Sequence, residues 1–202
     1  NHAMAGLDIC NTISKNIQTR NCATPGGTTG RQWVFQKHQF TGASTNNATT
    51  GALASFALKT GEKGIKANGR VKKGSGASNI STGDNGAVQN EQSLITVVKY
   101  ETENEAKAIM AFLRADAKVI FQETAKGTIR VYFWQFGSDG ASGTDGTGTV
   151  LTDDNDTVTA TITGTEIDLP RFFEVTPTAG ETVLAASINY LDELCVEDEA
   201  EG

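Results

Sequence analysis

The sequence lacks the residue patterns that usually mark metal and nucleophile sites. It has only three cysteines, Cys10, Cys22 and Cys195, and they form no C-x-x-C pair or Cys/His cluster. A zinc site is therefore not expected, and no cofactor is predicted. His2 and His38 have no acidic or thiol neighbour in sequence, which disfavours a catalytic Cys–His pair. We expect reduced thiols, with a Cys10–Cys22 disulfide as the alternative.

Long hydrophobic runs and targeting segments are also missing. No apolar stretch approaches the roughly 20 residues that a membrane-spanning helix needs, and no signal-peptide pattern opens the chain. The tripeptide before Met4 resembles a cloning remnant, so we expect the native chain to start at Met4. These features predict a protein without a membrane span that is synthesised in a cytoplasm.

Proline is scarce and positive charge is in deficit. Only 3 prolines accompany 22 glycines in 202 residues, and 38% of the residues are apolar. This mixture is typical of short strands and many turns around a real core, so a single mainly β domain, a sandwich or barrel, is expected. The net charge of −7 disfavours nucleic-acid binding by simple electrostatics.

One helix is predicted at residues 103–115. Thr102 and Glu105 have the spacing of a capping box, in which each side chain binds the backbone N–H of the other residue. Apolar residues then recur at helical spacing and form a stripe that must pack on a sheet. The stripe consists of Ala106, Ile109, Met110 and Leu113.

Strands are predicted where β-branched and aromatic residues gather. The clearest are 94–100, 118–123 and 128–136, joined by further strands at 31–37, 52–58 (a short helix is the alternative), 157–163 and 171–175. Residues 128–136 form the longest candidate and are apolar on both faces. One face would meet the core, and the other either the same chain or a neighbouring subunit. In 157–163, threonines alternate with Val158, Ala160 and Ile162, which predicts threonines facing outward.

The remaining segments are predicted to be loops, with one ambiguity. Residues 41–50 and 137–148 are polar and glycine-rich, and 137–148 lacks the ending of a phosphate-binding loop. Residues 182–195 fit a strand by alternation and also a helix with a stripe through Leu184, Ile188, Leu191 and Cys195. We favour a strand that ends near Tyr190.

Two segments carry strong and opposite charge. Residues 59–73 contain six basic residues against one acid, within a core-poor stretch, 59–90, that suits a long loop or a hairpin ordered against a partner chain. Residues 192–202 contain six acids and predict a solvated tail. The tail could bind these lysines on an adjacent copy. Assembly that survives molar salt unchanged would exclude such contacts.

Paired carboxylates provide the only hint of catalysis. Glu103 and Glu105, or Asp153 and Asp156, have a spacing that acid–base chemistry could use. Helix capping explains the first pair better and a turn the second, since the EF-hand pattern of glycine and glutamate is missing after Asp153. An enzyme is therefore not expected.

The order strand, capped helix, strand, turn, strand, preceded by a long Gly/Lys-rich excursion, resembles the tail tube proteins of long-tailed bacteriophages and the related inner tubes of injection machines. The resemblance covers roughly residues 31–175 and rests on 94–100, 102–114, 118–136 and the late hairpin-like 151–166.

Residues 5–24 are mixed and polar with weak periodicity, so the N-terminal segment 1–24 is expected to be an arm, with a first strand as the alternative. The resemblance implies two packed antiparallel sheets with one flanking helix, here residues 102–114. It further implies stacked rings, usually of six copies, that form a conduit for DNA in the virion, with other tail proteins as partners. Residues 61–89 would reach an adjacent ring. The implied inter-subunit contacts are Lys63, Lys66, Arg70, Lys72, Lys73, Tyr132 and Trp134.

A binding module is the alternative interpretation: a phage decoration protein, a fibre domain or a carbohydrate-binding sandwich. Its polar loops and its two tryptophans, Trp33 and Trp134, permit it. A sugar site would require at least one exposed tryptophan.

Overall fold

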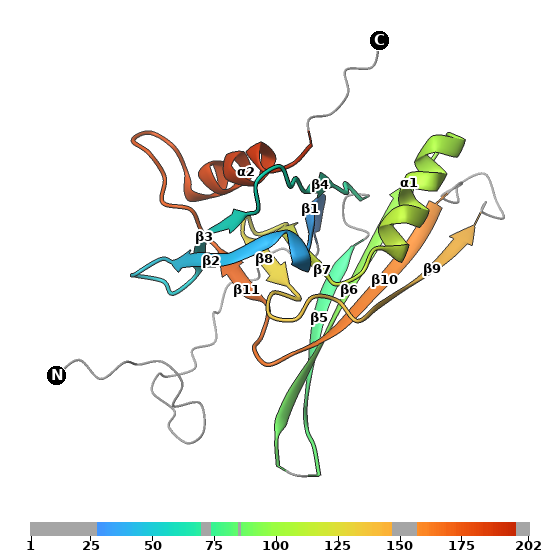
Figure 1. Ribbon diagram of the computed structural model, residues 1–202, viewed down its shortest axis with the longest axis horizontal. Helices are drawn as coiled ribbons and strands as arrows, with labels where there is room; N and C mark the ends of the chain where they lie inside the picture. The colour runs from blue at the N-terminus through green and yellow to red at the C-terminus, as the bar shows by residue number, and fades with distance from the viewer. Residues whose placement is uncertain (1–27, 70–73, 85, 147–156, 197–202) are drawn as a thin grey trace.

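Two β-sheets and two α-helices make up the described part of the chain, residues 28–69, 74–84, 86–146 and 157–196 of the computed structural model (Figure 1). The seven-stranded sheet has the order β2-β3-β11-β8-β7-β1-β4, and the four-stranded sheet the order β5-β6-β10-β9. The elements are β1 (Thr28–Gln36), the 3-10 turn η1 (Lys37–Gln39), β2 (Phe40–Asn46), β3 (Leu53–Leu58), β4 (Ile65–Lys66), β5 (Ser75–Thr82), β6 (Val88–Lys99), α1 (Glu103–Arg114), β7 (Lys118–Thr124), β8 (Ile129–Tyr132), β9 (Gly140–Gly146), β10 (Thr157–Glu166), β11 (Arg171–Phe173) and α2 (Val183–Glu193).

The seven-stranded sheet carries an aromatic core on the face that α2 covers. Its rings pack edge-on or stacked, as in the pair Phe56 and Phe121, whose centroids are 5.1 Å apart. Leu191 and Cys195 close this core from the C-terminal segment. All neighbouring strands in the sheet are antiparallel except β3 and β11, which pair in parallel.

A second core lies between the two sheets. Val34, Ile120 and Tyr132 of the seven-stranded sheet meet Leu94 and Ile162 of the four-stranded sheet. Helix α1 adds Phe112 to the same core and lies along the four-stranded sheet in Figure 1. The prediction of a mainly β fold with two packed sheets and a flanking helix is confirmed.

The capping box of α1 forms as predicted. Thr102 Oγ1 accepts a hydrogen bond from the Glu105 N–H at 3.2 Å, and the Glu105 carboxylate accepts one from the Thr102 N–H at 2.9 Å. The predicted stripe is wrong at Met110, which is exposed, because the helix instead buries Ile109 and Phe112. Its contact with the sheets is therefore rotated towards the Phe112 side.

The predicted strand at 128–136 ends early, at Tyr132. Phe133 has a φ of +60°, in the left-handed region, and its N–H donates to Gln92 Oε1 at 2.8 Å. In a continued strand Tyr132 and Phe133 would point to opposite faces. The reversal puts both rings into the core between the sheets. Strand β8 contributes Ile129 and Val131 to the aromatic core and Tyr132 to the core between the sheets, so its own chain covers both faces.

The favoured strand at 182–190 is wrong, because the segment forms helix α2. Thr182 caps it by accepting a hydrogen bond from the Ala185 N–H at 3.1 Å. The stripe from Leu184 to Cys195 packs on the aromatic core. The solvated tail was also predicted to start too early, since Asp192 belongs to α2 and Cys195 is a buried thiol.

Two predicted loops contain strands instead. Residues 40–46 form β2 beside β3, and 140–146 form β9 beside β10. Both are polar strands at the edge of a sheet. They form because backbone hydrogen bonding to a neighbouring strand does not require apolar side chains. The loop prediction was wrong because it relied on the polar, glycine-rich composition of these residues.

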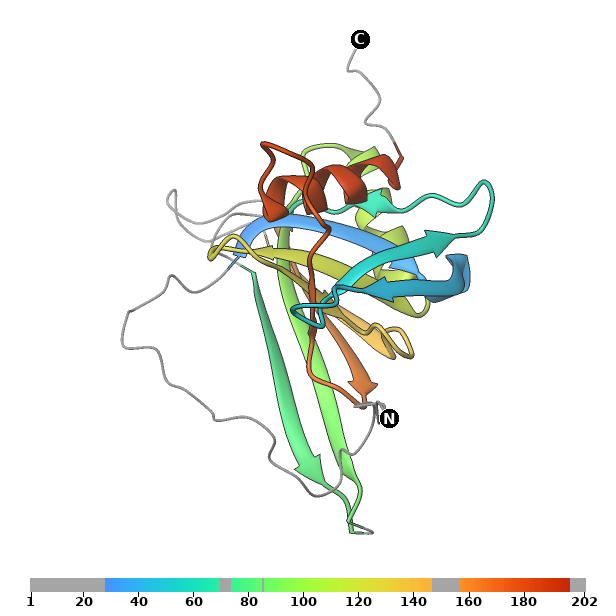
Figure 2. The same cartoon turned by 90° about the vertical axis from the view of Figure 1, so that its left-hand side faces the viewer.

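The segment 59–90 contains most of a long hairpin made of β5 and β6, which extends away from the rest of the molecule in Figure 2. Gly86, with a φ of +78°, donates to the Gly83 carbonyl at 2.8 Å, and Gly83 donates to the Ala87 carbonyl at 2.8 Å. This is the three-residue turn in which a left-handed glycine closes the hairpin. The second part of this segment therefore forms a hairpin, and its ordering against a partner chain stays a prediction.

Candidate assembly surface

The outer face of the four-stranded sheet is lined by hydroxyl groups. Strand β10 places every second residue on this face, and all of them are threonines: Thr157, Thr159, Thr161, Thr163 and Thr165. The outward orientation of the threonines predicted in 157–163 is therefore confirmed, while Ala160 and Ile162 are buried.

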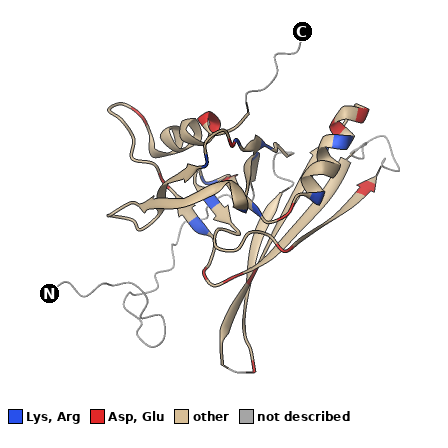
Figure 3. Ribbon diagram, in the orientation of Figure 1, with Lys and Arg blue, Asp and Glu red and all other residues tan. Residues whose placement is uncertain are grey.

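The neighbouring strands add mixed chemistry to this face: β9 contributes the hydroxyl residues Ser142 and Thr144, and β6 contributes Ser93 together with the apolar Ile95 and Val97. Cross-strand partners share a face, so each threonine is flanked by its partners on β6 and β9. Thr161, for example, pairs with Ile95 on one side and Ser142 on the other. The charged residues in register with this row are Glu91 and Lys99, at its two ends. Figure 3 shows most charged residues on other elements.

Both edges of this sheet are regular strands. Within the described residues, β5 pairs only with β6, and β9 only with β10. Strand β5 runs for 8 residues and β9 for 7, without a register shift. Neither contains proline or lysine, and Asp145 is the single charge on the two strands. Natural edge strands usually carry such blocking residues, bulges or covers, because a bare edge recruits another strand.

The turn of the hairpin determines which backbone groups point to the open side of β5. Because Gly83 bonds to Ala87, ladder bonds alternate from there, and Ser81 faces Gln89 on β6. The amides of Gly76, Ser78 and Ile80 consequently point away from β6, towards the open edge.

Side-chain amides on the inner face hold this sheet in place. Asn90 and Gln92 on β6 both donate to the Asp168 carbonyl, at 2.5 and 2.9 Å. Gln32 on β1 donates to Thr96 Oγ1 at 3.1 Å across the two sheets. Each of these amide side chains is nearly fully buried, so the bonds fix the hairpin relative to the seven-stranded sheet.

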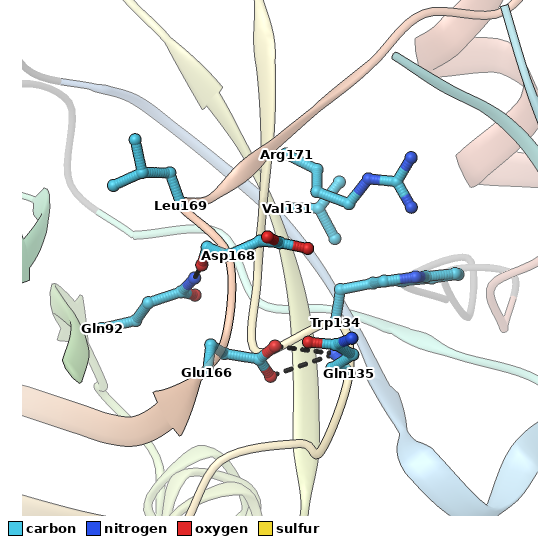
Figure 4. Close-up of a pocket in the computed structure, with 8 residues that line it drawn as sticks. All are labelled: Gln92, Val131, Trp134, Gln135, Glu166, Asp168, Leu169 and Arg171. Atoms are coloured by element: carbon cyan, nitrogen blue, oxygen red, sulfur yellow. Dashed lines mark hydrogen bonds between the residues drawn. The ribbon is translucent and has the colours of Figure 1, made fainter. Parts of the chain in front are cut away.

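A small polar pocket lies where the two sheets meet, and Figure 4 shows the residues that line it. Its volume of about 100 Å³ would admit only a few water molecules. The Glu166 carboxylate accepts hydrogen bonds from the N–H groups of Gln135 and Phe136, each at 3.0 Å. It thereby binds the turn that follows β8, and this structural role explains the carboxylate without a ligand.

Burial is the main cause of the pKa shifts of Glu166 and Lys37, the two charged residues beside this turn. Burial raises the pKa of Glu166 above its ordinary value, although the Phe136 and Gln135 amides and Lys37 act in the opposite direction. Burial likewise lowers the pKa of Lys37, against the attraction of Glu166. The Lys37 ammonium donates to the Trp134 carbonyl at 2.5 Å and lies 5.2 Å from the centre of its indole ring.

The four predicted contact residues that the structure describes do not form one surface. Exposed Lys63 donates to the Glu193 carbonyl at 3.2 Å, and Lys66 lies 4.0 Å from the Asp192 carboxylate, so both bind the end of α2. Tyr132 is only 5% exposed and serves the core between the sheets. Trp134 is partly buried against Phe40. Arg70, Lys72 and Lys73 lie outside the described residues, as do the predicted arm 1–24, the Cys10–Cys22 pair and the turn at 153–156.

The tryptophans offer no exposed platform for a sugar ring. Trp33 is fully buried, with its indole N–H donating to Asp192 Oδ1 at 2.7 Å. Trp134 lies under Lys37 and against Phe40, at a ring-centroid distance of 5.4 Å. The two tryptophans, which permitted the interpretation as a carbohydrate-binding module, therefore pack against other residues of this chain.

Sequence reasoning identified the threonine row but missed the surface to which it belongs. The alternation in 157–163 was a sufficient signal for the outward threonines, whereas the edge strand β9 has too many glycines to resemble a strand. Among the described residues, no cluster of His, Cys, Asp or Glu could hold a metal ion. No helix in this part of the chain is long and apolar enough to cross a membrane.

Comparison with protein-family models, curated proteins and solved structures finds no match to this chain.

Proposed function

We propose that this chain is a structural subunit without catalytic activity, whose four-stranded sheets join edge to edge into a closed tube. The observation that carries the proposal is the pair of regular, uncharged or weakly charged edges, β5 and β9, on either side of a hydroxyl-lined face. The resemblance to phage tail tube proteins supports the same interpretation. On this proposal the protein functions in a virion, with copies of itself and other tail proteins as partners.

The strand directions are compatible with closure. Each strand in the order β5-β6-β10-β9 is antiparallel to the next, so β5 and β9 run in opposite directions. If copies are related by rotation about one axis, β9 of one copy meets β5 of the next as an antiparallel pair. Such a head-to-tail contact closes into a ring when the rotation closes, and closure removes both open edges.

The outer face suits a conduit for DNA. Six copies, the number implied by the resemblance, would give a barrel of about 24 strands with a circumference of at least ~115 Å at ~4.8 Å per strand. A lumen of that size accommodates a duplex. A wall of hydroxyl and apolar groups with few charges would neither trap the phosphates by ion pairing nor repel them strongly.

The first experiment is negative-stain electron microscopy of the purified protein over a concentration series, together with its mass in solution. Rings or tubes with a central hole are the expected result. A stable trimer would contradict the proposal and favour the decoration or fibre alternative.

A matched pair of variants tests the edge itself. Ile80→Pro removes an amide that points to the open side of β5, whereas Ile80→Thr shortens the same exposed side chain and keeps the amide. We expect Ile80→Pro to abolish rings while the monomer unfolds at an unchanged denaturant concentration, and Ile80→Thr to assemble like the parent protein. Equal assembly of both variants would exclude β5 as the joining edge.

A further inference from the structure

The two edges of the four-stranded sheet have a hydrogen-bond pattern that can be followed from strand to strand. Ladder bonds alternate along each pair of strands, and the bond from Gly83 to Ala87 fixes the alternation. Odd-numbered residues of β6 therefore bond to β5 and even-numbered ones to β10, whose own odd-numbered residues bond to β9. The bond from the Asp139 N–H to the Thr163 carbonyl, at 2.8 Å, agrees with this assignment.

The backbone groups that point to the two open edges come from residues of the same face. On β9 they belong to Ala141, Gly143 and Asp145, and on β5 to the even-numbered residues. Both sets lie on the inner face, because Ala141 is in register with the buried Ile162 and Gly76 with the buried Leu94. Edges of this kind can pair without turning either sheet over, but parity alone allows registers that differ by two residues.

The single charged side chain on these edges is Asp145, at the open edge of β9. It is exposed, and its Oδ1 accepts a hydrogen bond from the Tyr100 hydroxyl at 2.9 Å. This bond holds the carboxylate on β9, where the strand of another copy would pair.

The opposite edge offers donors at one position. A Cβ atom at Gly76 would lie 2.0 Å from the Tyr132 hydroxyl oxygen, so this hydroxyl takes the place of a side chain at the edge of β5. Burial raises the pKa of Tyr132, while the charge of Arg130 and its hydrogen bond to the hydroxyl oppose that shift. Arg130 is only partly buried and lies 4.1 Å from the centre of the Phe172 ring. Because arginine can only donate, the hydroxyl hydrogen requires a further acceptor.

Distances across an antiparallel pair select one register. Opposite residues have Cβ atoms up to about 5.5 Å apart, and diagonal neighbours lie about 7–8 Å apart. A carboxylate oxygen extends about 2.4 Å beyond its Cβ, so Asp145 of another copy reaches the Tyr132 hydroxyl when it lies opposite Gly76. Opposite Ser78, two residues away, it falls short of hydrogen-bond distance.

We propose that the Asp145 carboxylate of one copy binds Arg130 and the Tyr132 hydroxyl of the next copy, and that this contact sets the register of the junction between β9 and β5. In the same register the exposed Ile80 gains the apolar neighbour Ala141. The inference rests on the proposed edge-to-edge assembly and adds the residues that select one pairing.

Mixing two charge-reversal variants tests the contact between copies. Arg130→Glu alone places two acids at every junction, and Asp145→Arg alone places two arginines there. In an equal mixture, each junction of an alternating ring pairs opposite charges. We expect each variant alone to need at least about tenfold more protein than the parent to form rings, and the mixture to need no more than about twofold more. Electron microscopy over a concentration series measures this, and urea unfolding of the dilute variants verifies that they fold.

Two results would overturn the inference and leave the proposed function intact. One is ring formation by each variant alone at the concentration that the parent needs. The other is a failure of the mixture to recover what the separate variants lose. A parent protein that forms no rings would overturn the proposed function together with this inference.

Crosslinking measures the register without changing Arg130 or Asp145. In a full-length chain carrying Cys10→Ser and Cys22→Ser, Asn79→Cys is combined with Ser142→Cys, its predicted partner on the outer face, or with Thr144→Cys, its diagonal neighbour. The first pair is non-hydrogen-bonded, with Cα atoms about 4.5 Å apart, which is within disulfide range, whereas the diagonal distance exceeds that range.

We expect mild oxidation of assembled protein to give crosslinked multimers on non-reducing gels with Ser142→Cys, at least about tenfold more than with Thr144→Cys. Strands β5 and β9 form opposite edges of the sheet within one copy, so these crosslinks report contacts between copies. Rings with equal crosslinking of both variants, or with more crosslinking of Thr144→Cys, would overturn the register and leave the proposed function intact.

Discussion

The two sheets of this protein differ in what covers their faces and in how regular their edge strands are. Both faces of the seven-stranded sheet meet apolar residues, which α2 supplies on one side and the four-stranded sheet on the other. Its edge strand β2 has two register shifts, and its edge strand β4 is only 2 residues long. The four-stranded sheet has a hydroxyl face, and its edges β5 and β9 are regular.

This contrast suggests that one sheet stabilises the fold and the other mediates association between copies. Short or irregular edge strands are common protection against unwanted pairing, and the seven-stranded sheet has them. The four-stranded sheet has no comparable protection among the described residues, although it contributes less of the aromatic core. We infer that the first sheet holds the fold together and that the second is the surface for self-association.

The largest expected effect is in the aromatic core. Phe121→Ala removes a fully buried ring that stacks on Phe56, and it should lower the free energy of unfolding by about 3–5 kcal/mol. Thr161→Ala, on the outer face of the other sheet, should lower it by less than about 1 kcal/mol. Urea unfolding of the dilute protein measures both. Similar losses would contradict the division between the two sheets.

A smaller loss is expected where α2 is tied to the seven-stranded sheet. Asp192→Ala leaves the buried Trp33 indole N–H without its acceptor, which should cost about 1–3 kcal/mol of unfolding free energy. Asp192→Asn keeps an acceptor oxygen and should recover most of the loss, because the ion pair with Lys66 is long, at 4.0 Å, and partly exposed. Equal destabilisation by both variants would mean that charge, not the hydrogen bond, matters here.

The cap of α1 should matter less again. Thr102→Ala removes the acceptor for the Glu105 N–H and should lower the unfolding free energy by about 1 kcal/mol, whereas Thr102→Ser should be nearly neutral. Thermal unfolding followed by circular dichroism measures the difference. No change in Thr102→Ala would show that packing of Phe112 alone fixes the helix.

The smallest effect is a pH dependence at the junction of the two sheets. Because burial raises the pKa of Glu166 in the folded state, the folded protein binds this proton more readily than the unfolded chain does. The contribution of Glu166 to stability therefore increases as the pH falls through its folded pKa towards its unfolded pKa. Relative to Glu166→Gln, the parent protein should gain stability between pH 7 and pH 4.5 in urea unfolding. A relative loss over that range would reverse the sign of the argument.

Several features could be predicted because nearby residues decide them. The α1 cap depends on two residues three positions apart, and the outward threonines of β10 depend on simple alternation. The candidate surface could be predicted only in this row. Lys63 and Lys66, expected at a subunit contact, bind the end of α2 at Glu193 and Asp192, which the sequence pattern had assigned to a solvated tail.

The sequence by itself determined the capped helix, the strong central strands, and the absence of metal-site and nucleophile motifs, because each depends on residues that are close along the chain. Only the tertiary structure decided that 183–193 is a helix, that the chain turns at Phe133 and that 140–146 is a strand. Segment 183–193 fits both periodicities, and an aromatic face built from distant strands selects the helix. Strand β9 has little apolar pattern of its own, and β10 supplies the backbone partners that make it a strand.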